Sequence, residues 1–251
     1  MKTHVLAGAF VLGVTGNVCV AAAGEAAEGT QTTVDWSGGY AGLHLGYAWG
    51  NSDYSDGQYN GAPPDFPVVN WDVGSDGLRV GAHAGYLWTR DRRVWGLEVD
   101  LGHVDLSGTR LQPGTDPYDV PYDAHGAVEG DWVVGLSAKL GYVFDRTLLY
   151  AKAGAAYTRA ELRFFDTCTT DPCGTGTIDA SEAVRWGYQL GIGIERALAC
   201  DWTLRAEYAW VDFGTKTITG TAAGEGFEGN VYNVNADLAV HNLVIGVNYR
   251  F

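Results

Sequence analysis

The chain has 251 residues and a formal net charge of −14, with 36 glycines, 9 tryptophans and 14 tyrosines. Its acidity argues against a nucleic-acid partner, because nucleic-acid phosphates are bound by Lys and Arg. The many aromatic residues exclude an intrinsically disordered chain, and no apolar run of about 18 residues follows the N-terminal segment, so no transmembrane helix is expected.

The N-terminal segment is typical of a secretory signal. Lys2 precedes the apolar stretch VLAGAFVLGV, and small residues follow at Ala21, Ala22 and Ala23. This succession of a basic, an apolar and a small-residue region predicts a cleaved signal peptide over residues 1–23. Residues 24–35 are predicted to be a flexible lead-in, and residues 36–251 a single domain.

The remainder of the chain alternates apolar and polar residues with a period of two. In the last segment, for example, Leu243, Ile245 and Val247 occupy every second position. Such a period predicts β-strands with one apolar face each. The segments that share it are 39–50, 78–88, 94–102, 132–144, 148–157, 185–195, 202–210 and 241–251.

The two faces of these strands differ in an unusual way. One face carries the large aliphatic and aromatic side chains, and the other is rich in glycine. In a soluble sandwich the apolar face would form the core and the polar face would meet water. Small residues that point inward suit a narrow barrel, and large apolar residues that point outward suit lipid. The sequence therefore predicts an all-β fold, an eight-stranded antiparallel up-and-down transmembrane β-barrel.

The connections between the segments alternate in length. The stretches TRDRR, FDRT and ALACD are short, whereas residues 51–73, 107–130, 166–183 and 214–234 are long and polar. Outer-membrane barrels have short periplasmic turns and long outer loops. We therefore expect four long outer loops, and both ends of the domain on the short-turn side.

The aromatic residues of the apolar face fall into two groups in this topology. Two aromatic belts are expected where a barrel meets the two membrane–water interfaces, whereas a β-sandwich core predicts no such sorting. The group expected near the turns is Trp88, Trp95, Tyr142, Phe144, Trp202, Tyr249 and Phe251. The group expected near the outer loops is Tyr47, Trp49, Trp132, Tyr157, Trp186 and Trp210.

One stretch leaves two interpretations open. Continuing the fifth strand by parity places Arg159, Glu161 and Arg163 on the outward face. Either this part of the strand stands above the lipid, or a bulge changes the register.

Several segments together resemble a known family. The stretches WSGGYAGLHLGYAWG, LGYVFDRTLLYAKAGAAY and DWTLRAEYAWVDFG, with the ending GVNYRF, are similar to the outer-membrane immunogenic proteins of alphaproteobacteria, which are porin-like, OmpA-type small β-barrels. The resemblance implies an eight-stranded, surface-exposed protein of the cell outer membrane that supports envelope integrity, and it does not imply a defined reaction.

The resemblance also implies partners. They are the outer-membrane lipids and lipopolysaccharide, and the barrel-assembly machinery during insertion. Tyr249 and Phe251 resemble the terminal signal that this machinery reads, and the absence of a tail implies that no peptidoglycan-binding domain follows. No nucleic acid is expected to bind, and the oligomeric state is not indicated.

Parity assigns ten charged residues to the barrel interior. They are Arg79, Glu98, Asp100, Lys139, Lys152, Arg185, Glu195, Arg205, Glu207 and Arg250, with His44, His83, Gln189 and Asn248 as neutral partners. A charge-selective pore would favour one sign, whereas this set mixes both, which in a narrow lumen indicates an internal salt-bridge network that plugs the barrel. The alternative is a narrow porin for passive diffusion of small solutes.

A lipid-modifying outer-membrane enzyme is the second alternative. His241 beside Asn242 invites the comparison, but no Ser or Cys in that strand supplies a nucleophile. The other histidines of the domain show no metal-like spacing. We therefore expect no catalytic residue, no cofactor and no metal.

The predicted loops carry two further features. Cys168 and Cys173 lie in the turn-rich stretch CTTDPCG, where an oxidising compartment permits a disulfide, and Cys200 is then a free thiol. The first two loops are rich in aspartate. This acidity predicts a solvated surface, with divalent-cation bridging to lipopolysaccharide phosphates as the functional alternative.

Overall fold

The structure is a computed structural model that describes residues 34–59, 67–166, 177–199, 201–224 and 228–251. The chain divides into two units, residues 1–30 and 31–251, and every described residue belongs to the second. The predicted signal peptide, most of the lead-in and the cysteines Cys168, Cys173 and Cys200 lie outside the described residues and stay predictions. No described segment is a helix of the length and apolarity that crossing a membrane requires.

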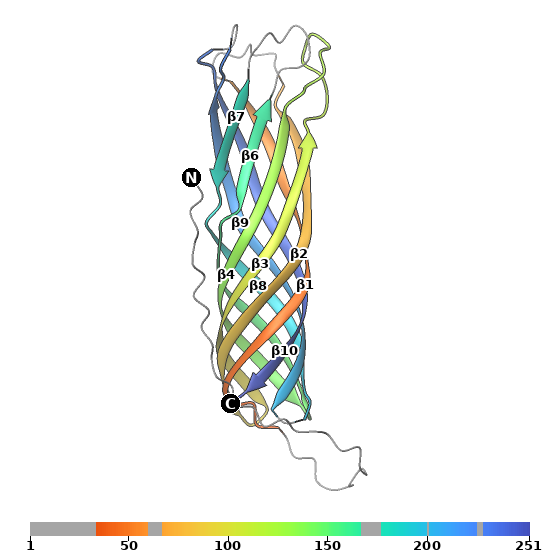
Figure 1. Ribbon diagram of the computed structural model, residues 1–251, viewed down its shortest axis with the longest axis vertical. Helices are drawn as coiled ribbons and strands as arrows, with labels where there is room; N and C mark the ends of the chain where they lie inside the picture. The colour runs from red at the N-terminus through yellow and green to blue at the C-terminus, as the bar shows by residue number, and fades with distance from the viewer. Residues whose placement is uncertain (1–33, 60–66, 167–176, 200, 225–227) are drawn as a thin grey trace, which may run out of the picture. The chain divides into compact units, whose positions relative to one another are not determined.

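All the named elements of the described residues are β-strands (Figure 1). In chain order they are β1 (Gly38–Tyr59), β2 (Val69–Arg90), β3 (Arg93–Leu111), β4 (His125–Phe144), β5 (Thr147–Thr158), β6 (Glu161–Asp166), β7 (Ile178–Ala183), β8 (Trp186–Ala197), β9 (Trp202–Thr221) and β10 (Val231–Arg250).

The antiparallel pairings form a closed circuit. Each strand pairs with the next in the order β1, β2, β3, β4, β5, β8, β9 and β10, and β10 pairs back with β1. The hairpin of β6 and β7 is not counted in this circuit. Its strand β6 pairs with the first residues of β4, His125–Glu129. In this ring the N-terminal β1 and the C-terminal β10 are neighbours, so neither is left with a free edge.

Ten strands are found where eight were predicted, because two predicted strands are interrupted at the same level. Thr158 N donates to Arg185 O at 2.8 Å, and the next bond runs from Val184 N to Ala160 O at 2.9 Å, so Arg159 is an extra residue between them. An unmatched residue of this kind is a β-bulge. Arg159 and Glu161 remain exposed, so β5 and β6 keep the predicted outward face across the break.

The same interruption corrects one prediction. Parity placed Arg185 inside the barrel, but Arg185 is exposed. Val184 is buried and Trp186 is exposed, although the two are separated by a single residue, so the alternation of β8 ends at Trp186 and does not extend to Arg185.

The short turns are confirmed and the long loops are corrected. Asp91 and Asp145 turn the chain between β2 and β3 and between β4 and β5, each with φ 57°, a conformation that Asp tolerates. The predicted loops 51–73, 107–130 and 214–234 are in large part strand, since β1 and β2 have 22 residues each. A tilted strand needs only about 9–11 residues to span a bilayer.

The long strands change their polarity along their length, as β10 shows. In its second half the outward residues Leu243, Ile245 and Val247 are apolar and exposed. In its first half the order is reversed, because Val234 and Leu238 are buried and the exposed positions are polar. At the turn end the ring therefore has an apolar outer surface and a polar interior. At the outer end it has an apolar interior and a polar outer surface, as in a soluble protein.

The hairpin of β6 and β7 belongs to the outer end, opposite the C-terminus of the chain (Figure 1). Phe164 of this hairpin is buried, and its ring lies 6.4 Å from that of Trp71. On the outer surface Arg163 Nε donates to Asp179 Oδ1 at 2.7 Å, and this hydrogen bond lowers the pKa of the Asp179 carboxyl.

The two predicted aromatic belts are confirmed. At the turn end Trp88 is paired with Trp95, and the rings of Trp202 and Tyr249 lie 5.3 Å apart. Toward the outer loops, the outward rings include Tyr157 and Trp186, whose centroids lie 5.0 Å apart. Between the belts the exposed side chains are aliphatic, among them Leu43, Leu78, Leu140, Ile192 and Ile245, each more than 60 % exposed. An apolar surface that encircles a protein in this way is expected to face lipid.

Candidate functional site

Seven buried side chains form a hydrogen-bonded cluster inside the ring, at the level of the apolar belt. We call this cluster the central network, and its members are Tyr40, Glu98, Lys139, Tyr150, Lys152, Arg205 and Glu207. They come from β1, β3, β4, β5 and β9, so the network joins the walls of the ring across its interior.

Glu98 lies at the centre of this network. Its Oε2 accepts from Lys139 Nζ at 2.5 Å, from Arg205 Nη1 at 2.7 Å and from the Tyr40 hydroxyl at 2.8 Å. Its Oε1 lies 3.4 Å from Lys152 Nζ. Three cations therefore surround one carboxylate, which is 1 % exposed.

Glu207 supplies the second negative charge. Lys152 Nζ lies 2.5 Å from its Oε1, while Arg205 Nη2 and the Tyr150 hydroxyl donate to its Oε2 at 2.9 and 2.7 Å. Arg205 thus bridges both carboxylates. A buried ion pair with its hydrogen bonds satisfied is tolerated, but removing one partner leaves an uncompensated charge.

Glycines on the inward face make room for these long side chains. Glu98 is opposite Gly85, Lys139 is opposite Gly96 and Glu207 is opposite Gly193. A Cβ at Gly85 would lie 2.6 Å from the Tyr40 hydroxyl, closer than atoms can approach. The inward-facing glycines therefore leave the space that the side chains of the central network occupy.

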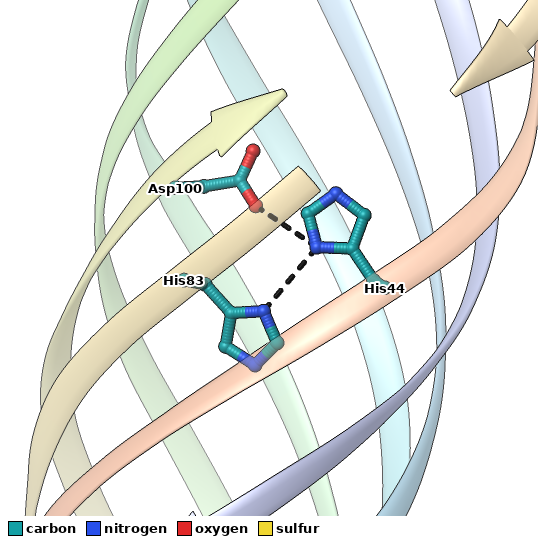
Figure 2. Close-up of side chains that lie close together, drawn as sticks. All are labelled: His44, His83 and Asp100. Atoms are coloured by element: carbon teal, nitrogen blue, oxygen red, sulfur yellow. Dashed lines mark hydrogen bonds and ion pairs between the residues drawn. The ribbon is translucent and has the colours of Figure 1, made fainter. Parts of the chain in front are cut away.

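A second group lies beside the central network and contains two histidines. We call His44, His83 and Asp100 the histidine cluster; they come from β1, β2 and β3 (Figure 2). His44 Nδ1 lies 3.2 Å from His83 Nδ1 and 3.5 Å from Asp100 Oδ2. All three residues are buried, and their ligand-type atoms lie within 4.8 Å of one another, so they could hold a metal ion.

Neighbouring side chains fix the orientation of the histidine cluster. Arg79 donates to the other carboxylate oxygen of Asp100, and its Nε lies 3.5 Å from His44 Nε2. On the other side His83 Nε2 lies 2.5 Å from Asn248 Oδ1, and Asn248 Nδ2 donates to Glu195 Oε1 at 2.6 Å. Glu195 also accepts from the Thr203 hydroxyl.

Apolar packing lies on both sides of the charged layer. Toward the turns, Trp36, Leu87, Val143 and Leu148 are buried in one cluster. Toward the outer end, a larger cluster fills the interior of the extended strands. The members of that larger cluster include Tyr54, Trp71, Val104, Leu106, Leu162, Phe164, Phe213, Ile218, Leu238 and Val240.

Two small cavities adjoin the charged layer. One, of about 20 Å³, is lined from β2, β3, β4, β9 and β10 by residues such as Arg79, Leu106 and Leu238. The other, of about 10 Å³, is lined by polar groups that include His44, Asp100 and Glu207. A water molecule needs roughly 10–15 Å³, so each cavity has room for about one.

The structure brings eight of the ten predicted interior charges together and leaves two outside. The buried ones are Arg79, Glu98, Asp100, Lys139, Lys152, Glu195, Arg205 and Glu207. Arg185 is exposed at the strand interruption. Arg250 is half-buried at the end of β10, where its guanidinium lies 5.2 Å from the ring of Trp36 and donates to Asp35 O at 2.7 Å.

Sequence reasoning missed three contributors to these groups: Tyr40, Tyr150 and Asn242. All three stand on the inward face by the same parity that located the charges, so their position was available as a signal. Tyr40 and Tyr150 donate to the two carboxylates, and Asn242 Oδ1 accepts from Arg79 Nη1 at 2.9 Å.

His241 has aromatic surroundings. Its ring stacks on Trp49 at 5.6 Å, and its Nδ1 lies 2.7 Å from the Tyr208 hydroxyl. This arrangement places His241 in the outer aromatic belt. Among the described side chains, none of its recorded contacts is to a serine or cysteine that would act as a nucleophile.

Curated relatives resemble the chain over most of its length. The 31 kDa outer-membrane immunogenic protein of Brucella melitensis is 26% identical over 221 residues, which cover 87% of this chain and 85% of the relative. The 22 kDa outer membrane protein of Rhizobium leguminosarum is 30% identical over 149 residues, 58% of this chain and 59% of the relative. These relatives are named as outer-membrane proteins and not as enzymes.

Two solved structures share the fold. The outer membrane protein OprG of Pseudomonas aeruginosa has a TM-score of 0.50 at 14% identity, covering 88% of this chain and 99% of that chain. The outer membrane protease OmpT of Escherichia coli has a TM-score of 0.50 at 10% identity, covering 88% of this chain and 100% of that chain. Likeness at this identity concerns the fold alone.

A family model places the chain. The model described as the outer membrane protein beta-barrel domain matches residues 17–251. Together with the alphaproteobacterial relatives, this match locates the protein in the cell outer membrane. The chain belongs to the family of outer membrane β-barrel proteins.

Proposed function

We propose that this protein is an eight-stranded outer-membrane barrel whose role is structural and surface-exposed, supporting envelope integrity with a closed lumen. The eight strands are those of the pairing circuit, with β6 and β7 counted as the outer parts of β5 and β8. This proposal makes the protein neither a pore nor an enzyme.

One observation carries the proposal: the interior charges neutralise one another. The central network and the residues around the histidine cluster hold four anions, Glu98, Asp100, Glu195 and Glu207, and four cations, Arg79, Lys139, Lys152 and Arg205. Ion pairs bind the two carboxylates of the central network to three of the cations. A charge-selective pore would favour one sign of charge, and apolar packing on both sides of the charged layer does not favour a continuous water-filled passage.

Single-channel recording tests this proposal. The refolded protein is inserted into a planar lipid bilayer, with a conducting porin in the same membrane as the positive control, and insertion is verified by protection from added protease. We expect no resolvable conductance steps from the inserted protein. Reproducible steps whose ion selectivity changes in Lys139→Gln would replace this proposal with the narrow diffusion pore.

The proposed partners follow from the location. Outer-membrane lipids and lipopolysaccharide are the surroundings of the apolar belt and of the outer loops. We further propose that Tyr249 and Phe251 are read by the barrel-assembly machinery during insertion. In support, Phe251 is 78 % exposed and its side chain is thus available for contact, while its backbone N donates to Gly39 O at 3.0 Å.

A further inference from the structure

We propose that His44, His83 and Asp100 form a binding site for a divalent transition metal of the zinc class inside the barrel. This inference is independent of the closed lumen. Figure 2 shows the three side chains converging from three adjacent strands. The chain spacing gives no hint of the site, because β1, β2 and β3 bring together residues that are far apart in the sequence.

The distances match those of a zinc site. Zinc binds imidazole nitrogen and carboxylate oxygen at about 2.0–2.2 Å, so neighbouring ligands of a tetrahedral ion lie about 3.3–3.5 Å apart. The two nitrogens of His44 and His83 are 3.2 Å apart, and His44 Nδ1 is 3.5 Å from Asp100 Oδ2. Two of the three edges of the site are therefore present in the side-chain positions of the structure.

The surroundings leave a lone pair on His83 for the ion. Asn248 Nδ2 donates to Glu195, so Asn248 Oδ1 faces His83 and accepts from its Nε2–H. This tautomer leaves His83 Nδ1 unprotonated and directed toward His44 Nδ1. A hydrogen bond from the second nitrogen of a metal-ligating histidine to a fixed acceptor is the usual support for such a site.

The donor set and the space beside it also favour a cation. Asp100 supplies a carboxylate ligand: Arg79 contacts its Oδ1, while its Oδ2 faces His44 Nδ1. The cavity of about 10 Å³ beside His44 and Asp100 has room for one water molecule as a fourth ligand.

Without metal, His44 Nδ1–H donates a hydrogen bond to the unprotonated His83 Nδ1. Binding of the ion replaces that bond and turns His44 to the tautomer that carries its proton on Nε2. This tautomer can no longer accept from Arg79 Nε. His44 Nε2–H then faces Arg79 Nε–H, two donors whose nitrogens lie 3.5 Å apart in the present positions, so Arg79 must shift when the ion binds.

The test measures zinc retained by the folded barrel. Because the site is enclosed, the protein is refolded in detergent with zinc and then passed over a chelating column, and bound zinc is measured by elemental mass spectrometry. All variants carry Cys168→Ser, Cys173→Ser and Cys200→Ser, so that thiols do not bind the metal. Cobalt loading adds a spectroscopic reading, since tetrahedral cobalt absorbs strongly in the visible range.

The variants distinguish this site from adventitious binding. We expect about one zinc per chain in the parent and in His241→Gln, a histidine of the aromatic belt that serves as the matched control. His44→Gln and His83→Gln should each retain at least tenfold less, with folding checked by tryptophan fluorescence and by the gel mobility of the unheated protein. A parent that retains no zinc, or His83→Gln that retains as much as the parent, overturns the proposal.

Discussion

At the scale of single residues, Glu98 holds the interior together. It pairs with Lys139, Lys152 and Arg205; in its absence Lys152 and Arg205 would keep Glu207, and Lys139 would lose its ion-pair partner. Tyr40 would lose its acceptor as well. The energetic consequence of a change at Glu98 is therefore an excess of buried positive charge.

Glu98→Gln should lower the free energy of unfolding by about 3–5 kcal/mol, the typical cost of breaking a buried ion pair. Urea unfolding in lipid vesicles, followed by tryptophan fluorescence, measures it. Arg185→Gln is the matched control, because Arg185 was predicted to be interior but is exposed, and its loss should change stability by less than about 0.5 kcal/mol. Equal effects of the two substitutions would contradict this account of the interior.

The same scale shows what the sequence can and cannot predict of the site. Parity alone located Glu98, Lys139 and Arg205 on the inward face, because an uninterrupted strand keeps its period of two. Parity failed at Arg185, where the strand stops for two residues. It placed His44, His83 and Asp100 on the inward face but could not show that they meet, since the contact between His44 and His83 depends on the register of β1 against β2.

At the scale of elements, each long strand has two parts with opposite polarity. The period of two is the same in both parts, so periodicity could not tell which face is inward at the outer end. Tyr54 and Trp71 lie in a stretch that was predicted to be a loop, because its Asp, Gly and Pro content indicated turns. In the structure both residues are buried, and they are paired with each other across β1 and β2. Tertiary packing at the outer end overrides that local composition.

The boundary between the two parts can be located by substitution. Leu136 is outward and 56 % exposed within the apolar belt, and Leu136→Arg should cost about 2–4 kcal/mol of stability in lipid. Ser107 is outward and exposed on the outer part of β3, where Ser107→Arg should have an effect close to zero. Unfolding in vesicles compares the two. A large cost at Ser107 would show that lipid extends to the outer end.

At the scale of the whole molecule, the pairing circuit leaves neither terminal strand with an open edge, and the interior is crossed by ion pairs. A closed ring is stiff, because every strand in it is hydrogen-bonded on both sides. The proposed role in envelope integrity rests on such a body, held in the membrane by its apolar belt and its two aromatic belts, and that role needs no passage through the ring.

Deletion of the gene should therefore separate two phenotypes. The deletion strain should become more sensitive to detergent and to chelators of divalent cations, while its uptake of a small hydrophilic solute stays at the level of the parent strain. Growth assays and radiolabelled uptake measure these effects, and plasmid-borne wild-type protein should restore resistance. Slower uptake with unchanged detergent sensitivity would instead identify a transport role.

The alternation of apolar and polar residues in the strands that carry the apolar belt also affects secretion, which precedes folding. In the unpaired chain the apolar run Leu243–Val247 is short, because Asn242 precedes it and Asn248 and Arg250 follow it. A secretion channel releases a segment sideways into the inner membrane when about 20 consecutive residues are predominantly apolar. The unfolded chain is therefore not retained in the inner membrane. Its continuous apolar surface forms only when the strands pair in the outer membrane.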